Sequence, residues 1–316
     1  MVRKWLVSVC LLLCIMVLGC GNQENKSNEE TAFLHIEDDA DRQVILMKKP
    51  EKIISLSPSF LEPLEAVGAN LIARPTSKTS VPEFAKNLEE VGAVYNINVE
   101  KVVALKPDLV IAYQGMHDKL VPILESNHIP VIILKMKTYQ DVKDKIKLFG
   151  EITGQESKSQ LVIAKMDDKI QKIIEKMPKE NKRIAILHST AKSVTVELDG
   201  SIAGSTAKTL GLTNIALASK NVDQFSESIP YSMESLVEQD PKIIFVVTMG
   251  TMEEIKKRML ADVESNPAWS SLTAVKNKHV YFLPQELFLL NPGLNYPEAF
   301  ECMARLAYPE VFEDGK

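Results

Sequence analysis

The chain has 316 residues, of which 45% are hydrophobic and 25% are charged, and its formal net charge is −5. This length is sufficient for one large or two ordinary folded domains. The acidic balance, with no basic run, argues against a nucleic acid as the partner.

The N-terminal stretch predicts an export signal rather than part of a fold. A charged start is followed by an apolar run from Trp5 to Leu18, which is too short for a membrane-spanning helix, and then by a polar segment. The letters VLGC resemble the bacterial lipobox, in which signal peptidase cleaves before the cysteine and the cysteine sulfur receives a lipid. We therefore predict a lipoprotein signal peptide at 1–19 and lipid attachment at Cys20. The alternative is a plain signal peptide.

The residues around the predicted cleavage site bear on how the mature chain is stabilised. Cleavage would remove Cys10 and Cys14, leave Cys20 and Cys302, and change the net charge to −7. No disulfide framework is then available, so the core must provide the stability. The eleven residues after Cys20 contain no aliphatic or aromatic side chain. Such a segment cannot bury enough surface to fold, which predicts a flexible tether at 20–32.

From Lys52 onward, short apolar runs alternate with helical patterns. The runs are rich in β-branched residues and apolar throughout, which is typical of strands buried on both faces of parallel sheets. They read KIISLS, NLIARP, DLVIAY and IPVIILK in the first half of the chain, and RIAILHS, KIIFVV and HVYFLP in the second. The predicted fold class is α/β with mostly parallel sheets.

The middle of the chain has two successive helical patterns with no strand between them. The second runs from Gln155 to Met177, keeps an approximate helical period and ends at Pro178. At 1.5 Å per residue this helix would be roughly 35 Å long, about the size of a small domain. The sequence therefore predicts an N-terminal α/β lobe (33–154), a connecting helix (155–178) and a C-terminal α/β lobe (179–316). The alternative is an ordinary surface helix over a single sheet.

One sequence unit occurs twice, once in each predicted lobe. NVEKVVALKPDLVIAY begins at Asn98 and SMESLVEQDPKIIFVV begins at Ser232. In both units a glutamate, Glu100 or Glu234, lies in the first turn of a predicted helix, seven residues before a proline. The first residue of each unit is a good helix cap, and the helix dipole favours a carboxylate there, so local helix chemistry alone would explain either glutamate. Lobes related by a pseudo-twofold axis would present both carboxylates on the same side.

These features together resemble the periplasmic-binding-protein superfamily that supplies ATP-driven importers, and most of all the group that handles ferric siderophores, haem and cobalamin. The resemblance covers Phe33 to Phe312. It is carried by KIISLSPSFLEPLEAVGA, VGAVYNINVEKVVALKPDLVIA, DGSIAGSTAKTLGLTNIA, YSMESLVEQDPKIIFVV and AVKNKHVYFLP, in this order. It implies a class III fold with two lobes joined by one long helix, no intrinsic cofactor, and a monomer that docks on a permease dimer. In that family the glutamates matching Glu100 and Glu234 pair with arginines of the two permease halves.

Ligands of open α/β sheets bind beyond the carboxyl ends of the strands. In two lobes those ends would face each other across a cleft, and the residues there are mainly aromatic or sulfur-containing, with Arg74 as the strong cation. The predicted cleft residues are Ser59, Arg74, Tyr95, Tyr113 and His117 from the first lobe, and His188, Met249, Phe288 and Asn291 from the second.

Within this group, ARPTSKT, GTMEEIKKRM and AVKNKHVY resemble stretches of haem-binding lipoproteins. The resemblance implies that haem iron would be held at the positions of Tyr95 and Met249, where those proteins have a methionine and a histidine. Tyrosine and methionine each ligate haem iron in other proteins, so the pair is chemically possible. The departure at both positions leaves haem, a ferric siderophore and a corrinoid open as the ligand. The alternative is that Tyr95 only packs in its loop and Met249 only fills core.

Two alternative functions are also considered for a lipid-anchored α/β chain of this kind. A zinc- or manganese-binding lipoprotein also has a long connecting helix, and His117 and His188 would reach the cleft; His35, His128 and His279 accompany strand patterns and are predicted to be structural. A lipid-anchored α/β hydrolase would be an enzyme, but the chain has no G-x-S-x-G, P-loop, G-x-G-x-x-G or H-E-x-x-H motif. We predict an extracytoplasmic binding protein, not an enzyme.

Overall fold

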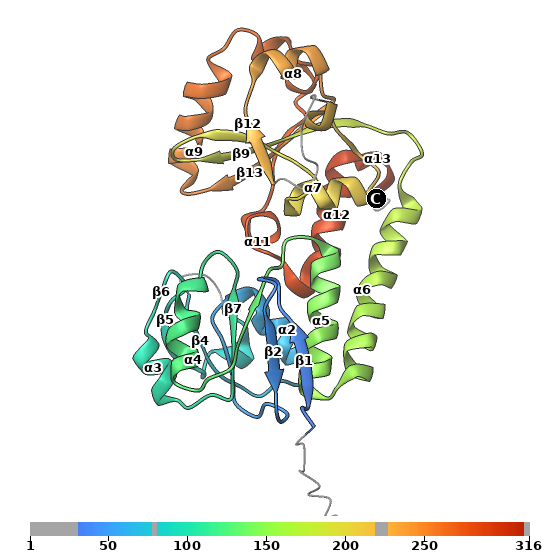
Figure 1. Ribbon diagram of the computed structural model, residues 1–316. Helices are drawn as coiled ribbons and strands as arrows, with labels where there is room; N and C mark the ends of the chain where they lie inside the picture. The colour runs from blue at the N-terminus through green and yellow to red at the C-terminus, as the bar shows by residue number, and fades with distance from the viewer. Residues whose placement is uncertain (1–30, 78–80, 219–226, 313–316) are drawn as a thin grey trace, which may run out of the picture. The chain divides into compact units, whose positions relative to one another are not determined.

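Two six-stranded sheets and one hairpin make up the strands of residues 31–77, 81–218 and 227–312, the ranges that the computed structural model describes (Figure 1). The predicted signal peptide, Cys20 and the tether up to residue 30 lie outside the described residues. In these ranges no helix is both long and apolar enough to cross a bilayer.

The N-terminal sheet has the strand order β6-β5-β4-β3-β7-β8, and all neighbours are parallel except β5 and β6. Its strands are β3 (Ile53–Ser55), β4 (Leu71–Thr76), β5 (Glu89–Ala93), β6 (Asn96–Ile97), β7 (Leu109–Tyr113) and β8 (Val131–Leu134). Three short helices lie between them: α2 (Leu61–Ala66), α3 (Val99–Ala104) and α4 (Val121–Ser126). The hairpin β1 (Leu34–Glu37) and β2 (Gln43–Leu46) precedes the sheet.

The C-terminal sheet has the order β12-β10-β9-β13-β14, with β11 paired to β9. Its strands are β9 (Arg183–Thr190), β10 (Val194–Glu197), β11 (Thr213–Asn214), β12 (Ser228–Pro230), β13 (Ile243–Met249) and β14 (Val280–Phe282). The helices are α7 (Ile202–Thr209), α8 (Met233–Gln239), α9 (Met252–Met259), α10 (Thr273–Lys276), α11 (Gln285–Phe288), α12 (Tyr296–Ala307) and α13 (Pro309–Phe312). Strands β9, β11, β13 and β14 pair in parallel, whereas β10 pairs antiparallel with both neighbours.

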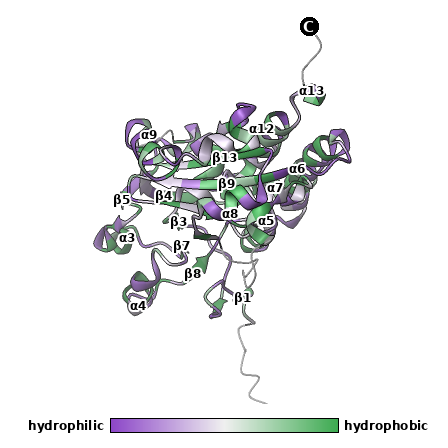
Figure 2. Cartoon of the chain, turned by 90° about the horizontal axis from the view of Figure 1, so that it is seen from above, coloured by the Kyte–Doolittle hydropathy of each residue, from purple (hydrophilic) through white to green (hydrophobic). Residues whose placement is uncertain are grey.

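Two helices lead from the first sheet to the second, α5 (Tyr139–Thr153) and α6 (Glu156–Lys176). Thr138 and Asp141 form a capping box that starts α5, and Gly154 ends it in the left-handed conformation with φ of 59°. The 21 residues of α6 give a length of about 32 Å. This helix carries both hydrophobic and hydrophilic residues (Figure 2) and packs against α5 and α12 (Figure 1). The long helix predicted after Gln155 is therefore present.

The hydrophobic core continues from the first sheet to the second through these helices. One cluster includes buried residues of β3 and β7, of α5 and α6, and of β9, β13 and α12. Within it the ring of Tyr296 lies 5.5 Å from that of Tyr139, and the Tyr296 hydroxyl donates to the backbone oxygen of Lys137 at 2.7 Å. From Phe33 onward the chain forms one compact unit.

The α/β class with mostly parallel sheets is confirmed, and a strand lies in each of the seven apolar runs. The sequence reasoning missed the β1–β2 hairpin and the short strands β5, β6, β10, β11 and β12. Those strands include exposed or polar positions and make several antiparallel pairs at sheet edges, so they lack the continuous apolar signal of a strand buried on both faces.

Candidate functional site

A pocket of about 330 Å³ lies where the C-terminal sheet meets the segment that follows β8. Its volume is within the usual range of small-molecule sites. Most of the lining comes from β9, β10, the start of α7, β12 and α11, and one side chain comes from the N-terminal half. The lining residues are Lys137, His188, Thr190, Ser193, Thr195, Glu197, Ser201, Ile202, Glu227, Ser228, Phe288 and Leu289.

A histidine and a glutamate form the polar centre of this pocket. The antiparallel pairing of β9 and β10 places Thr195 opposite His188, so Glu197 lies diagonally from His188 on the same face. The His188 Nδ1 and Glu197 Oε1 atoms are 2.7 Å apart. Because an ionised carboxylate only accepts hydrogen bonds, Nδ1 is the donor. Glu197 is 5% exposed, and its second oxygen, Oε2, has no hydrogen-bond partner among the described residues.

The start of α7 forms another wall of the pocket. Ser201 caps the helix, since its hydroxyl accepts from the Gly204 N–H at 2.9 Å. A Cβ atom at Gly204 would lie 1.9 Å from the backbone oxygen of Leu198. Glycine therefore allows α7 to begin directly against the end of β10, and this places the partial positive charge of the helix N-terminus at the pocket.

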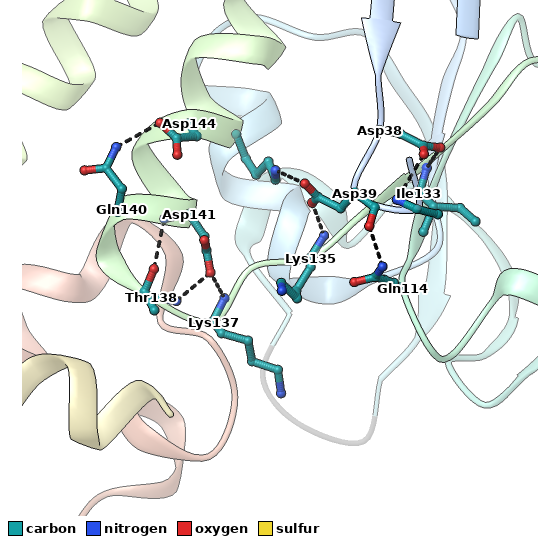
Figure 3. Close-up of polar contacts among 12 residues, drawn as sticks. Asp38, Asp39, Gln114, Ile133, Lys135, Lys137, Thr138, Gln140, Asp141 and Asp144 are labelled. Atoms are coloured by element: carbon teal, nitrogen blue, oxygen red, sulfur yellow. Dashed lines mark hydrogen bonds and ion pairs between the residues drawn. The ribbon is translucent and has the colours of Figure 1, made fainter. Parts of the chain in front are cut away.

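Lys137 reaches the pocket from a segment whose backbone is held by two carboxylates (Figure 3). Asp141 Oδ2 accepts from the Lys137 N–H at 2.9 Å, and Asp39 accepts from the Lys135 N–H and from the Lys145 ammonium. The Lys137 side chain points away from these contacts (Figure 3), and its Nζ lies 3.3 Å from Glu227 Oε2. This ion pair joins the N-terminal half to the C-terminal half at the pocket.

The predicted cation of the first half is already neutralised. Arg74 is 5% exposed, and its guanidinium pairs with Glu90 at 2.9 Å and donates to the backbone oxygens of Ala85 and Pro75. In these buried, charge-assisted contacts the N–H donors of the guanidinium are bonded to protein acceptors. Arg74 therefore organises β4 and β5 and does not offer a free positive charge.

The two other predicted residues near the ends of β3 and β7 also have local roles. The Tyr113 ring stacks on Phe60 with centroids 5.7 Å apart, and its hydroxyl donates to the Met136 backbone oxygen at 3.2 Å. Burial raises the pKa of this phenol. Ser59 is half-buried, and its N–H donates to the Ser57 hydroxyl.

His117 holds the loop that carries Tyr95. The imidazole is 2% exposed, its Nδ1 accepts from the Tyr113 N–H at 3.0 Å, and its Nε2 lies 2.8 Å from the Val94 backbone oxygen. Because Nδ1 is the acceptor, Nε2 carries the proton and the ring is neutral. Both nitrogens are thus engaged with backbone, and Tyr95, the residue after Val94, is 78% exposed.

The predicted residues of the second half have different surroundings. His188 and Phe288 line the 330 Å³ pocket together. Asn291 donates to the Met136 backbone oxygen at 3.0 Å and accepts from the Gly293 N–H, so it joins the two halves beside Lys137. Met249, at the end of β13, is 51% exposed and does not line this pocket. In the part of the chain that the structure describes, no three His, Cys, Asp or Glu side chains gather as a metal site.

The most informative pocket residues were missed from the sequence. Glu197 is the last residue of the hairpin strand β10 and Ser201 follows that strand, and Lys137 and Glu227 come from connecting segments, whereas the prediction used only the ends of parallel strands. A signal for Glu197 was available, because RIAILHST and VTVE are separated by a short polar turn that is typical of a hairpin.

A larger hollow of about 660 Å³ lies between α5, α6 and α7. There the Tyr139 hydroxyl donates to Asp167 at 2.8 Å and the Lys143 ammonium lies 3.3 Å from the same carboxylate. These side chains come from helices and not from strand ends. We therefore take the smaller pocket as the candidate binding site, since it lies at strand ends.

Both copies of the repeated unit have the predicted local structure. Asn98 Oδ1 accepts from the Lys101 N–H at 2.9 Å to start α3, and Ser232 Oγ accepts from the Ser235 N–H at 3.2 Å to start α8. Each helix leads to a central strand, β7 or β13. Glu100 and Glu234 are exposed in the first turns.

The buried His117 predicts a pH dependence of stability. Burial lowers the pKa of its imidazole from the usual 6.5, so below about pH 6.5 the unfolded chain takes up a proton that the folded chain resists. The free energy of unfolding should therefore decrease as the pH is lowered through this window, by up to about 1.4 kcal/mol per pH unit from this one group. We expect His117→Gln to remove this component in urea unfolding between pH 7.5 and 5.5. Equal slopes in the wild-type protein and in His117→Gln would contradict the assignment.

Residues 53–287 match the family described as periplasmic binding protein, and this range includes strands of both sheets. The chain belongs to the periplasmic binding protein family. The resemblance inferred from the sequence is thereby confirmed. The geometry agrees with it, since the candidate pocket of this binding protein lies at strand ends and joins the two halves.

Relatives of this binding protein occur in Bacillus subtilis and Staphylococcus aureus. It is 27% identical over 327 residues to the ABC transporter substrate-binding lipoprotein YvrC of Bacillus subtilis, with 99% of each chain covered. It is 27% identical over 304 residues to the Fe(3+)-citrate-binding protein YfmC of the same species, with 93% of each chain covered. The high-affinity heme uptake system protein IsdE of Staphylococcus aureus is 24% identical over 261 residues, which cover 82% of this chain and 88% of IsdE.

Solved structures confirm the fold of this binding protein. S. aureus SirA complexed with staphyloferrin B matches with a TM-score of 0.72 and 21% identity, covering 88% of this chain and 98% of SirA. S. aureus IsdE complexed with heme matches with a TM-score of 0.71 and 24% identity, covering 81% of this chain and 98% of IsdE. The two-lobe class III fold is therefore shared at low sequence identity.

Proposed function

We propose that this protein is the substrate-binding component of an ABC importer, and that it captures a ferric siderophore, haem or a corrinoid between its two sheets. The observation that carries the proposal is the family match across both sheets, with a ligand-sized pocket at their junction. The names of the relatives, which include a ferric citrate binder and a heme uptake protein, support the ligand class. The protein then acts by binding and delivery, without catalysis.

The proposal includes attachment to the outer face of the cell membrane by a lipid on Cys20. The lipobox sequence and the name of the lipoprotein relative YvrC support this attachment. The body would be a monomer formed by an N-terminal lobe and a C-terminal lobe, with α6 as the connection between them. The continuous core through α5, α6 and α12 favours limited closure of the lobes over a wide hinge motion.

Docking on the permease dimer is assigned to Glu100 and Glu234. Both carboxylates are exposed and lie in first helical turns on matching supersecondary units, one in each half. A carboxylate and an arginine form a directional, charge-assisted pair, so one contact per lobe would let the permease sense the spacing of the lobes.

If the cargo is haem, Tyr95 and Met249 are the proposed iron ligands. Their exposure at the strand ends of opposite halves supports this assignment, because a phenol oxygen and a thioether sulfur would be accessible there. Haem added to the purified protein should then shift the Soret band, and Tyr95→Phe should change that shift. The same shift in the variant would remove Tyr95 as a ligand.

The proposed function is tested by a thermal-shift screen of purified protein with haem, ferric citrate, ferrioxamine B and cyanocobalamin. A ligand that binds only the folded state stabilises it, by about 2.7 kcal/mol at a hundredfold excess over Kd. One of these compounds should give a saturable rise in Tm without turnover. Absence of a shift with all four, in folded protein, would contradict the proposal.

A further inference from the structure

One nitrogen of His188 is free in the candidate pocket. The Nδ1 atom donates to Glu197 Oε1 at 2.7 Å, so when the ring is neutral its other nitrogen, Nε2, carries the lone pair. This Nε2 is bonded to none of the described residues and, unlike Glu197 Oε2, it is not closed off from solvent. The His188 side chain is 23% exposed and lines the pocket. The pocket therefore contains an accessible imidazole nitrogen whose tautomer is set by a carboxylate.

The pair of His188 and Glu197 has the arrangement of a metal-binding histidine and its supporting carboxylate. A ligating imidazole usually donates its second N–H to a carboxylate, a backbone carbonyl or water, which orients the ring and makes the ligating nitrogen more basic. Glu197 is 5% exposed and is held on β10 beside His188 on β9. Because its second oxygen is enclosed, Glu197 can act on a ligand only through His188.

The other polar groups of the lining are occupied or are weak metal ligands. Lys137 and Glu227 are paired with each other. The Thr190 hydroxyl is bonded to the backbone of the turn between β9 and β10, and the Ser201 hydroxyl caps α7. The positive charges, on Lys137 and at the α7 N-terminus, accompany two carboxylates, so charge alone does not select the cargo. The remaining side-chain hydroxyls are neutral and belong to Ser193, Thr195 and Ser228.

A single free nitrogen restricts the form in which a metal can bind. A bare zinc ion needs three or four protein ligands, and residues 31–77, 81–218 and 227–312 form no group of three His, Cys, Asp or Glu side chains that could hold one. A chelate whose chelator fills every coordination position has none to offer to the imidazole. The metal must therefore arrive in a chelator that leaves one position open or occupied by water.

We propose that His188 Nε2 ligates the metal of the cargo, with Glu197 as a positioning residue, and that the cargo is a planar macrocyclic chelate with an exchangeable axial position, the class of haem and the corrinoids. This inference rests on the proposed function and narrows it. In the ligation step the Nε2 lone pair forms a bond to the metal, a bound water leaves, and no electron is transferred. Phe288 and Leu289 supply an apolar wall for the ring.

The register of the sheet relates His188 to Met249. Strand β13 places Val247 opposite His188 and Met249 opposite Thr190, so His188 and Met249 lie on the same face of neighbouring strands. One axial position on this side of a metal accepts only one of them. Imidazole suits iron, whereas thioether sulfur is a soft ligand, and only His188 is oriented by a carboxylate. In ferric haem, His188 would thus take the axial position in place of Met249.

The test uses protein with ¹⁵N-labelled histidine and three probes. Ferric haem and aquocobalamin each have an exchangeable axial position, whereas the chelator of ferrioxamine B fills the coordination of its iron. We expect the wild-type protein to bind haem or aquocobalamin more tightly than ferrioxamine B. The bound probe should show a histidine signature: coupling of haem iron to a histidine ¹⁵N in pulsed EPR, or a shift of the aquocobalamin visible spectrum as imidazole replaces water.

Three variants assign the signature to its residue. His188→Gln keeps a donor for Glu197 but lacks the imidazole, so the signature should be lost. Glu197→Gln should keep the signature and weaken binding by roughly tenfold to a hundredfold, the usual effect of removing the group that orients a metal-binding histidine. The control is His128→Asn, which removes an exposed histidine outside the pocket, at a left-handed position that asparagine tolerates. It should bind as the wild-type protein does.

The outcomes separate this inference from the proposed function. A wild-type complex without the histidine signature would overturn the inference, whether or not the variants fold. A signature that persists in folded His188→Gln would also overturn it, as would preferential binding of ferrioxamine B or ferric citrate. Each of these results leaves the importer function standing. If neither the three probes nor ferric citrate bind, the proposed function itself fails.

Discussion

Replacement of both Glu100 and Glu234 by alanine should stop uptake of the cargo while its affinity for the purified protein stays unchanged. Each carboxylate is exposed and lies outside the candidate pocket, so its removal should affect docking and not cargo binding. A charge-assisted hydrogen bond contributes about 1.5–3 kcal/mol. The loss of two such contacts would weaken docking by roughly two to four orders of magnitude. Uptake of a radiolabelled cargo by cells, together with calorimetry on the purified variant, measures the two quantities separately.

The double variant needs a control with the same change in charge. Glu175→Ala with Glu264→Ala removes two exposed carboxylates elsewhere, on α6 and after α9. This control should transport at the wild-type rate. Each single variant, Glu100→Ala or Glu234→Ala, should give an intermediate rate, because one lobe can still dock. Normal uptake by the double variant would show that the repeated carboxylates serve only to start their helices.

The Tyr296→Ala variant should lose about 3–5 kcal/mol of unfolding free energy, the usual cost of truncating a large buried aromatic side chain. Tyr296 is fully buried at the start of α12, where its ring contacts those of Tyr139 and Phe300. Its hydroxyl donates to the Lys137 backbone oxygen. The variant therefore loses core contacts between α5 and α12 together with a bond that holds the segment carrying Lys137. Urea unfolding, followed by circular dichroism, measures the effect.

The conservative Tyr296→Phe variant separates the two contributions. It retains the ring and loses the hydroxyl, which bonds to the Lys137 backbone oxygen and to the Asn291 side chain, so its cost should be about 1–2 kcal/mol, plus the penalty of an unpaired carbonyl. We also expect it to weaken cargo binding more than its small effect on stability would suggest, since the Lys137 segment is released. A loss in Tyr296→Ala no greater than in Tyr296→Phe would contradict a role for this aromatic cluster in joining the halves.

Local sequence chemistry determined much of the architecture. The apolar runs of β3, β7, β8 and β13 became strands because a strand buried on both faces requires continuous hydrophobic residues. The polar caps at Asn98 and Ser232 determined the starts of α3 and α8. The helical period after Gln155, with no strand before it, was sufficient to place α6. These features depend on residues close together in the chain, so they can be predicted from the sequence.

The candidate site depended on contacts that the sequence does not encode locally. Arg74 and His117 were predicted at the cleft because they lie at strand ends. Both side chains are buried and hydrogen-bonded to nearby backbone groups, and Arg74 is also paired with Glu90, so in this structure they hold neighbouring loops and strands together. The pairing of His188 with Glu197 requires the antiparallel register of β9 and β10. The contact of Lys137 with Glu227 joins residues 90 positions apart.

By itself, then, the sequence determined the fold class, the connecting helix and the two matching glutamates, because each follows from periodicity, capping or repetition along the chain. Only the tertiary structure decided which polar groups are free to meet a ligand. Whether a side chain is available depends on the hydrogen bonds it has already made, and those partners come from strands and segments that folding alone brings together.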